Sequence, residues 1–261
     1  MPITFAHPAA AVLLVRPLQR LAVLSALVAG SLPPDYPYFL PLRISRNTTH
    51  SFESLFWFSL PAGLLTYVLF HRLIDRPFFA LMPESWQRRR ATARQAAASP
   101  VWSAAVIVSV FLGALTHVVW DSFTHGGGRG ADVLPWIESR LFVVSGYTVY
   151  AFNVLQHTSS LVGVTFLSWR IRRWFRAAPE EGTSPAPEFS RRTRVIVVAA
   201  LVALACAAAV AVGLSRFPSR VTVGALQPFV RRVVVAGMGT LTLGVLLYSA
   251  AWQWRYGRGE P

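Results

Sequence analysis

Long apolar stretches separated by short polar segments dominate the chain. Five of these stretches approach or exceed the length of about 20 residues that a helix needs to cross a bilayer; they occupy residues 52–73, 101–123, 141–169, 195–214 and 233–254. Few charged side chains interrupt them. The pattern therefore predicts an all-α fold, namely a polytopic transmembrane helical bundle with about five spanning helices.

Two shorter apolar runs precede the first of these spans. Residues 9–15 are too few to cross a bilayer, and Pro17 interrupts the helix before a second run at 18–30. We expect these runs to form a short N-terminal helical hairpin. Its open ends, His7 and the proline-rich segment around Asp35, would then return to the same side.

The alternative is one continuous helix over residues 9–30. It would place His7 and Asp35 on opposite faces of the membrane and would hold Arg16 and Arg20 in the middle of the bilayer. Charged side chains are costly there. The hairpin is therefore the favoured interpretation.

The composition agrees with a membrane protein, since 54% of the residues are hydrophobic and 14% are charged. The formal charge of +14 comes from arginine alone, a usage typical of a GC-rich bacterial genome. Nucleic-acid binding would suit this charge, but the arginines gather at the ends of apolar runs, where membrane proteins keep cytoplasmic anchors. We expect a lipid bilayer as partner and no nucleic acid. The single cysteine, Cys206, excludes a disulfide framework and a thiolate metal site.

The basic segments predict the orientation of the spans. The positive-inside rule assigns the arginine-rich loops after residue 72 and near residues 170–194 to the cytoplasm. His50, before one span, and His117 to His125, at the end of the next, would then share the extracytoplasmic face. The arginines between the last two spans would also be outside, which counts against this topology; they are Arg216, Arg220, Arg231 and Arg232.

The chain also suggests a division into two parts. Residues 1–140 contain the histidines and aspartates that we single out below, so we expect a helical core there. Residues 141–261 would add transmembrane helices and a basic cytoplasmic loop near 170–194, whose proline- and glutamate-rich stretch 178–190 predicts a disordered linker.

A polar motif closes the second long apolar stretch, in the sequence THVVWDSFTHGGG at residues 116–128. His117, Asp121 and His125 recur every four residues, so a helix would place them on one face, each about 6 Å further along the axis. His117 and His125 would be about 12 Å apart, too far for one ion, whereas Asp121 between them could bridge two. Such groups at the end of a membrane helix indicate a functional site.

The predicted topology brings further donors to the same end. These candidate metal ligands are His7, Asp35, His50, His117, Asp121 and His125. Imidazole and carboxylate groups together suit zinc, manganese or iron, and they are the usual ligands of two-metal hydrolytic centres. Glu53, one turn beyond His50, is a weak candidate for a general base.

Each candidate also has a purely structural interpretation. His117 with Asp121 could be a hydrogen-bonded pair that caps a helix bundle, Asp35 a turn residue and His50 a helix-start residue. The same His-x-x-x-Asp spacing occurs at His71 and Asp75, at the basic end of a span, where we expect an interfacial anchor. For His157, on a polar helical stripe, we favour packing in the bundle interior over ligation.

Several sequence blocks resemble a known family. MPITFAHPAA, AGSLPPDYPYFLPL, TTHS and GALTHVVWDSFTH, spread over roughly the first half of the chain, resemble an uncharacterised bacterial multi-pass membrane family, domain of unknown function 4184. Their order is also similar to that of membrane-bound metal-dependent hydrolases and, more remotely, of zinc-dependent phospholipase C. The resemblance implies metal ligands at Asp35, His50, His117 and Asp121, with His7 and His125 as further candidates.

By the same resemblance, the chain would hydrolyse a phosphoester, phospholipid or lipid-linked substrate with one or two divalent ions, zinc foremost, in the bacterial inner membrane. Two departures limit the analogy. No His-x-x-x-Glu pattern follows His125, and Tyr36-Pro37-Tyr38 stands where the membrane hydrolases often have a second acidic residue. A non-catalytic transporter or scaffold with a structural polar cluster is therefore the rival hypothesis.

Overall fold

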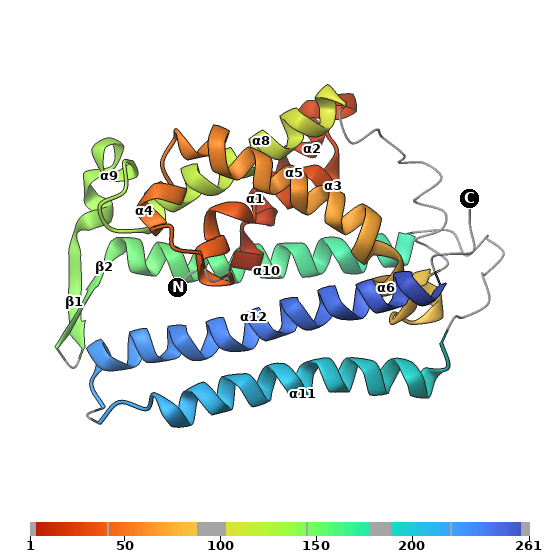
Figure 1. Cartoon of the computed structure of the whole chain (residues 1–261). Helices are drawn as coiled ribbons and strands as arrows, with labels where there is room; N and C mark the ends of the chain where they lie inside the picture. Colours follow the sequence, from red (N-terminus) through yellow and green to blue (C-terminus); the bar gives the residue numbers. More distant parts are fainter. Residues whose placement is uncertain are drawn as a thin grey trace. The chain divides into compact units, whose positions relative to one another are not determined.

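The computed structural model describes residues 4–40, 42–87, 103–144, 146–177, 189–219 and 221–256. Over this range the chain is almost entirely helical, with one small two-stranded sheet (Figure 1). The all-α prediction is thereby confirmed. The chain divides into two compact units, which we describe separately: Met1–Tyr67, Pro100–Ile171 and Thr222–Gly224 form the first, and Val68–Ser99, Arg172–Val221 and Ala225–Pro261 the second.

Residues 4–30 form the expected helical hairpin. The first arm contains the 3-10 turn Thr4–Ala6 and the short helices α1 (Pro8–Leu13) and α2 (Val15–Leu18). The second arm is α3 (Leu24–Gly30). The chain reverses at Gln19, whose φ of 47° lies in the left-handed region, at the start of the 3-10 turn Gln19–Leu21. Pro17 lies in the first turn of α2, where proline is tolerated, so the break falls after it.

The hairpin packs against α8 (Ala104–Thr124) through an unusually close helix contact. A Cβ atom added to Gly30 would lie 2.0 Å from the carbonyl oxygen of Val110, and one added to Gly113 would lie 2.1 Å from that of Leu27. The backbones therefore touch, and only glycine fits at both positions. The Ser109 hydroxyl strengthens this contact, because it donates to the Leu21 carbonyl at 3.1 Å and its oxygen accepts from the backbone N–H of Val23.

The first long span is a single run of helix from Leu55 to Ala80. It contains α5 (Leu60–Leu69) and α6 (Asp75–Ala80), with π-helical turns at Leu55–Ser59 and Phe70–Ile74. The described chain resumes at Ser103, which is the N-cap of α8. Its side chain accepts a hydrogen bond from the Val106 N–H. The expected arginine cluster at residues 88–90 and 94 lies outside the described residues.

The segment expected to be a third span differs from the prediction. Its start forms an antiparallel hairpin of β1 (Arg140–Val144) and β2 (Tyr147–Tyr150), and helix begins only at α10 (Ala151–Ala177). The β-branched and aromatic residues of this stretch favour strands, and Gly146 turns between them with a φ of 80°. The polar residues early in α10, Gln156 to Ser160, lower its hydropathy.

Among the described residues, four helices are long and apolar enough to cross a membrane: Leu55–Ala80, Ala104–Thr124, Arg191–Ser215 and Gly224–Tyr256. These helices indicate a multi-pass membrane protein. Within the described residues α10, which occupies most of the expected third span, does not meet this criterion.

The last two spans are α11 (Arg191–Ser215) and α12 (Val223–Tyr256), which run side by side in Figure 1. They approach closely where Gly237 faces Ala205 and Ala209. The predicted disordered linker falls largely on residues 178–188, which lie outside the described residues, and the division at residue 140 stays a prediction.

Between α8 and the sheet, the chain forms two short helical turns, α9 (Gly130–Val133) and the 3-10 turn Pro135–Glu138. Before the first span, the 3-10 helix Pro33–Tyr38 and the short helix α4 (Arg46–Thr49) carry two of the predicted site residues. These two segments lie in the first unit with the hairpin and α8.

Candidate metal centre

Four of the predicted ligands converge within the first unit. Asp35 comes from the 3-10 helix after the hairpin, His50 caps the C-terminus of α4, and His117 and Asp121 lie on the last turns of α8. Each offers one ligand atom, and these four atoms all lie within 4.8 Å of one another. The side chains of all four are at most 8% exposed.

The distances between these atoms suit a tetrahedral ion. His50 Nε2 lies 3.5 Å from Asp35 Oδ1 and 3.0 Å from Asp121 Oδ2, and His117 Nε2 lies 3.6 and 3.7 Å from the same two oxygens. A tetrahedral zinc ion with ligand bonds of about 2.0–2.1 Å holds its ligand atoms about 3.3–3.4 Å apart. The four separations between the histidines and the carboxylates are therefore close to those that such an ion requires.

Backbone carbonyls orient both imidazole rings. His117 Nδ1 lies 2.7 Å from the Ser31 carbonyl oxygen, and His50 Nδ1 lies 3.1 Å from that of Arg46. A carbonyl only accepts, so in each case Nδ1–H is the donor and Nε2 carries the lone pair. Each lone pair is thus available beside the carboxylates, and this hydrogen-bonding pattern is the usual one for metal-bound histidine.

Three of the four ligand atoms have no hydrogen bonds within the described part of the chain, whereas Asp121 Oδ2 accepts one from Arg46. The unpaired buried atoms include Asp35 Oδ1, Asp121 Oδ1, His50 Nε2, His117 Nε2 and both ring nitrogens of His7. An unsatisfied buried polar atom costs about 1–3 kcal/mol, so several in one place need an explanation. A bound cation would satisfy lone pairs of all four residues, and the donor set fits zinc.

His7 lies directly against these four residues. Its ring stacks on that of His117 with centroids 3.7 Å apart, and its Nε2 lies 3.5 Å from Asp121 Oδ1. Burial, reinforced by the charge of His117, lowers the pKa of His7 to about 3. The imidazole is therefore neutral near pH 7 and can act as a ligand or a hydrogen-bond partner.

His125 also lies near Asp121, but it is not part of helix α8, where the four-residue spacing predicts it to lie. Helix α8 ends at Thr124, and His125 is extended, with φ −134° and ψ 145°. Its Nδ1 lies 3.5 Å from Asp121 Oδ2, while its Nε2 lies 2.7 Å from the Gln156 amide nitrogen. Burial lowers the pKa of His125 to about 4. The residue borders the aspartate, but its outer nitrogen is occupied by α10.

All six predicted residues therefore gather in one place, and we call them the His/Asp cluster: His7, Asp35, His50, His117, Asp121 and His125. Burial raises the pKa of Asp35, but His117 and His50 outweigh this effect and hold it below the ordinary value. Asp35 is thus a carboxylate, as a metal ligand must be.

Sequence reasoning missed several residues that contact the cluster, and three of them come from outside its immediate sequence neighbours or carry a charge. Arg46 Nη2 lies 2.7 Å from Asp121 Oδ2, Thr4 donates its hydroxyl to Asp35 Oδ2 at 2.6 Å, and Gln156 contacts His125. Arg46 precedes His50 by four residues, which was the available signal, because helical spacing places them on one face. Thr4 and Gln156 gave no comparable signal, since only the tertiary fold brings them near.

The other residues that the sequence analysis considered do not belong to the His/Asp cluster. His157 is exposed, so the prediction that it packs in the bundle interior was wrong; Gln156 and Ser160 on the same helix are buried instead. The Glu53 side chain is exposed and does not belong to the cluster. His71 is also exposed, in the π-helical turn Phe70–Ile74 of the Leu55–Ala80 helix.

A family model described as Domain of unknown function (DUF4184) matches residues 1–250, and the chain belongs to this family. The match extends well beyond the first half of the chain, and it includes most of the last two spans, which the sequence blocks had not covered. No curated protein and no solved structure matches the chain significantly. The similarity to metal-dependent hydrolases and phospholipase C therefore has no support from a named relative.

Proposed function

We propose that this protein is a membrane-embedded, zinc-dependent hydrolase of phosphoester or lipid-linked substrates. The observation that carries the proposal is the convergence of buried ligand atoms from Asp35, His50, His117 and Asp121, of which those of Asp35, His50 and His117 have no hydrogen bond among the described residues. Paired carboxylates and imidazoles form the common ligand set of hydrolytic metal centres. A bound zinc ion lowers the pKa of coordinated water to about 7 and so supplies a nucleophile at neutral pH.

The protein's own groups have distinct roles in this proposal. The carbonyls of Ser31 and Arg46 fix the rings of His117 and His50, so that both ligands are oriented before an ion binds. Asp121 would hold an ion through Oδ2, while its Oδ1 lies toward His7. That second oxygen can accept a proton or contact a second ion, which is why we propose one or two ions.

Arg46 adds a positive charge at the edge of the cluster. Its side chain is 28% exposed, whereas that of Asp121 is 2% exposed, so the guanidinium extends from the buried carboxylate toward the surface. Guanidinium groups bind phosphate oxygens through directed, charge-assisted hydrogen bonds. We therefore assign Arg46 to the recognition of an anionic substrate group.

The proposed location is the bacterial inner membrane, with the cluster on the extracytoplasmic side. The four candidate spans support insertion in a bilayer. The side rests on the arginine-rich segment after residue 72, between the first two candidate spans, which the positive-inside rule assigns to the cytoplasm.

The rival function is a structural zinc site in a transporter or scaffold. It is favoured by the number of ligands, because four protein groups can complete a tetrahedral shell, whereas catalytic zinc usually keeps one position open. The rival predicts bound metal without hydrolysis. Metal content and activity must therefore be measured on the same preparations.

The deciding experiment measures metal content in the full-length protein purified in detergent. We expect at least one equivalent of zinc in the wild type and its loss in His117→Gln and Asp121→Asn, which preserve side-chain size. His157→Gln, an exposed histidine outside the cluster, is the matched control and should retain the metal. No bound metal in wild-type protein that has been supplied with zinc would refute the proposal.

The second measurement is hydrolysis of a panel of phosphomonoesters, phosphodiesters and phospholipids. We expect an activity that a chelator removes and added zinc restores, and that both cluster variants lack. Full zinc occupancy with no hydrolysis of any panel member would instead support the structural rival.

A further inference from the structure

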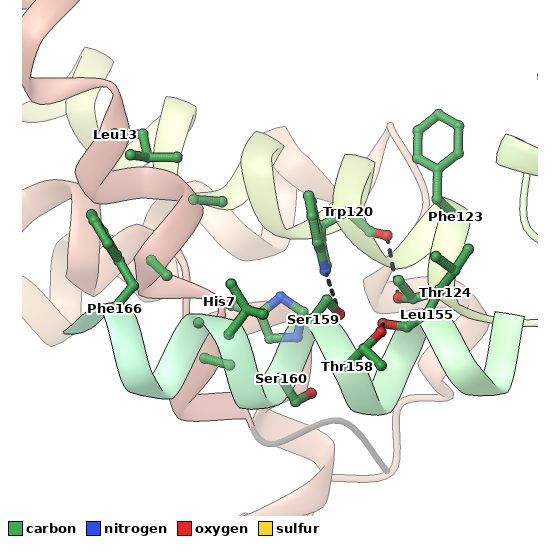
Figure 2. Close-up of a pocket in the computed structure, with 15 residues that line it drawn as sticks. His7, Leu13, Trp120, Phe123, Thr124, Leu155, Thr158, Ser159, Ser160 and Phe166 are labelled. Atoms are coloured by element: carbon green, nitrogen blue, oxygen red, sulfur yellow. Dashed lines mark hydrogen bonds between the residues drawn. The ribbon is translucent and has the colours of Figure 1, made fainter. Parts of the chain in front are cut away.

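A cavity of about 550 Å³ adjoins the His/Asp cluster. It lies between α1 with the turn that precedes it, the last turns of α8 and the part of α10 from Leu155 to Phe166 (Figure 2). The volume falls within the range of roughly 300–1,000 Å³ that is typical of small-molecule sites. The small side chains of Ala9 and Ala10 line this space.

The walls of the cavity are apolar in practice, although several hydroxyl groups line it. Thr124, Thr158 and Ser160 each donate to a carbonyl oxygen four residues earlier in their own helix, at 3.2, 2.7 and 2.8 Å. Trp120 donates its indole N–H to the Ser159 hydroxyl, which joins α8 to α10 (Figure 2). The hydroxyls are thus already satisfied, and an occupant must be apolar to fit.

His7 connects this apolar space to the cluster. It is the only titratable residue in the described lining, and it also stacks on His117 and lies 3.5 Å from Asp121 Oδ1. An occupant that fills the cavity therefore has one end close to the candidate metal ligands. The matching ligand is an amphiphile with an apolar body and a polar end.

The cavity opens at an apolar surface. Its lining includes three large side chains that remain exposed, Leu13 at 61%, Trp120 at 45% and Val162 at 67%. Trp120 belongs to α8, one of the candidate membrane spans. In a membrane protein such surfaces meet lipid tails, so the cavity is accessible from the bilayer.

We propose that the cavity holds one acyl chain of the lipid substrate and places the lipid's polar end at His7, beside the ligand set. This inference rests on the proposed function and narrows its substrate class from phosphoesters in general to membrane lipids. A polypeptide fits less well, because its backbone needs hydrogen-bond partners that the described lining does not offer. An acyl chain needs none.

The test is photolabelling of the full-length protein in phosphatidylcholine nanodiscs that contain a trace of phosphatidic acid with a diazirine at the acyl terminus. Labelled peptides are then located by mass spectrometry. In the wild type we expect label on the cavity walls of α1 and α10. The variants Ala10→Leu and Thr158→Leu, which add side-chain volume to two different walls, should lose that label.

The matched control is Ala200→Leu, the same change on an exposed position of α11. It should leave cavity labelling at the wild-type level, and label on the lipid-facing surface of α11 serves as an internal reference in every sample. Equal cavity labelling in the filled variants and the wild type would overturn the proposal. So would wild-type label confined to lipid-facing surfaces, which would indicate only the surrounding bilayer.

The two proposals fail separately. Asp121→Asn should lose zinc but keep the cavity label, because the lining does not include the carboxylate. Zinc binding and phosphoester hydrolysis without cavity label would overturn the acyl-chain site alone. If the wild type shows cavity label but binds no zinc, the acyl-chain site is supported and the proposed zinc-dependent hydrolase is refuted.

Discussion

The imidazole rings of His7 and His117 stack almost face to face, with centroids 3.7 Å apart and an interplanar angle of 13°. The ring of His117 is fixed by the Ser31 carbonyl, whereas neither nitrogen of His7 has a hydrogen bond within the described residues. The two histidines are thus adjacent but differ in role. His117 serves the four-residue ligand set, and His7 faces the cavity.

This difference leads to a prediction for His7→Phe. Phenylalanine preserves the stacked ring but removes both nitrogens, so zinc at Asp35, His50, His117 and Asp121 should be retained while hydrolysis falls. Zinc content and turnover measured on one preparation would test this. If a second ion is bound, its equivalent should disappear in the same variant.

The control for that prediction is His157→Phe, at an exposed position on α10. It should change neither zinc content nor turnover. Complete loss of zinc from His7→Phe would contradict the division of roles between the two stacked histidines.

Arg46→Gln should weaken the binding of anionic substrates while leaving zinc in place. The guanidinium is an ion-pair partner of Asp121 and not a ligand, so its loss should raise KM more than it lowers kcat. A charge-assisted hydrogen bond is worth about 1.5–3 kcal/mol, which corresponds to a change of roughly 10- to 150-fold. Arg46→Lys should recover only part of the loss, because the ammonium cannot reproduce the fork geometry.

Arg43→Gln provides the comparison, since Arg43 lies in the same segment but is exposed. It should behave as the wild type in both KM and zinc content. An equal rise of KM in the two variants would mean that general charge, and not the position of Arg46, matters.

Gly30→Ala and Gly113→Ala should each destabilise the protein. The new methyl group would meet a carbonyl oxygen 2.0 or 2.1 Å away, and the helices would have to move apart. Overpacking of this kind costs about 1–3 kcal/mol or more. The Tm in detergent, followed by tryptophan fluorescence, should therefore fall. Gly224→Ala, where nothing lies within 4 Å of the added atom, should leave the Tm unchanged.

The orientation has its own test. A reporter that is active only outside the cytoplasm, fused after Gly128, should be active, because this glycine follows the end of α8 on the cluster side. A fusion after Arg94, in the arginine-rich segment between the first two candidate spans, should be inactive. The reverse pattern of activity would invert the proposed topology.

Much of the cluster could be predicted from the sequence, because strong local constraints apply there. The four-residue spacing of His117 and Asp121 sets their common face on any helix, and the cost of mid-membrane arginines at positions 16 and 20 favoured the hairpin. That hairpin and the antiparallel spans sufficed to bring His7, Asp35 and His50 to the same end.

Other features depend on interactions that local patterns do not encode. The apolar stretch beginning at Leu141 is compatible with either a strand or a buried helix, and periodicity alone does not separate them. The approach of Gly30 to Gly113 and the contact of Arg46 with Asp121 are tertiary. The cavity could not be foreseen either, because its shape depends on the packing of three separate segments.

The glycine contact between α3 and α8 also fixes the position of the His117 ring relative to the other candidate ligands. Ser31, whose carbonyl fixes the ring of His117, directly follows Gly30, and its backbone nitrogen lies 3.1 Å from the Cβ position of Gly113. Sliding one helix along the other by a single residue, about 1.5 Å, would exceed the tolerance of a zinc bond length. In the proposed metal centre the spacing between α3 and α8 would therefore restrict the ionic radius, and mutations at this glycine contact would change metal selectivity.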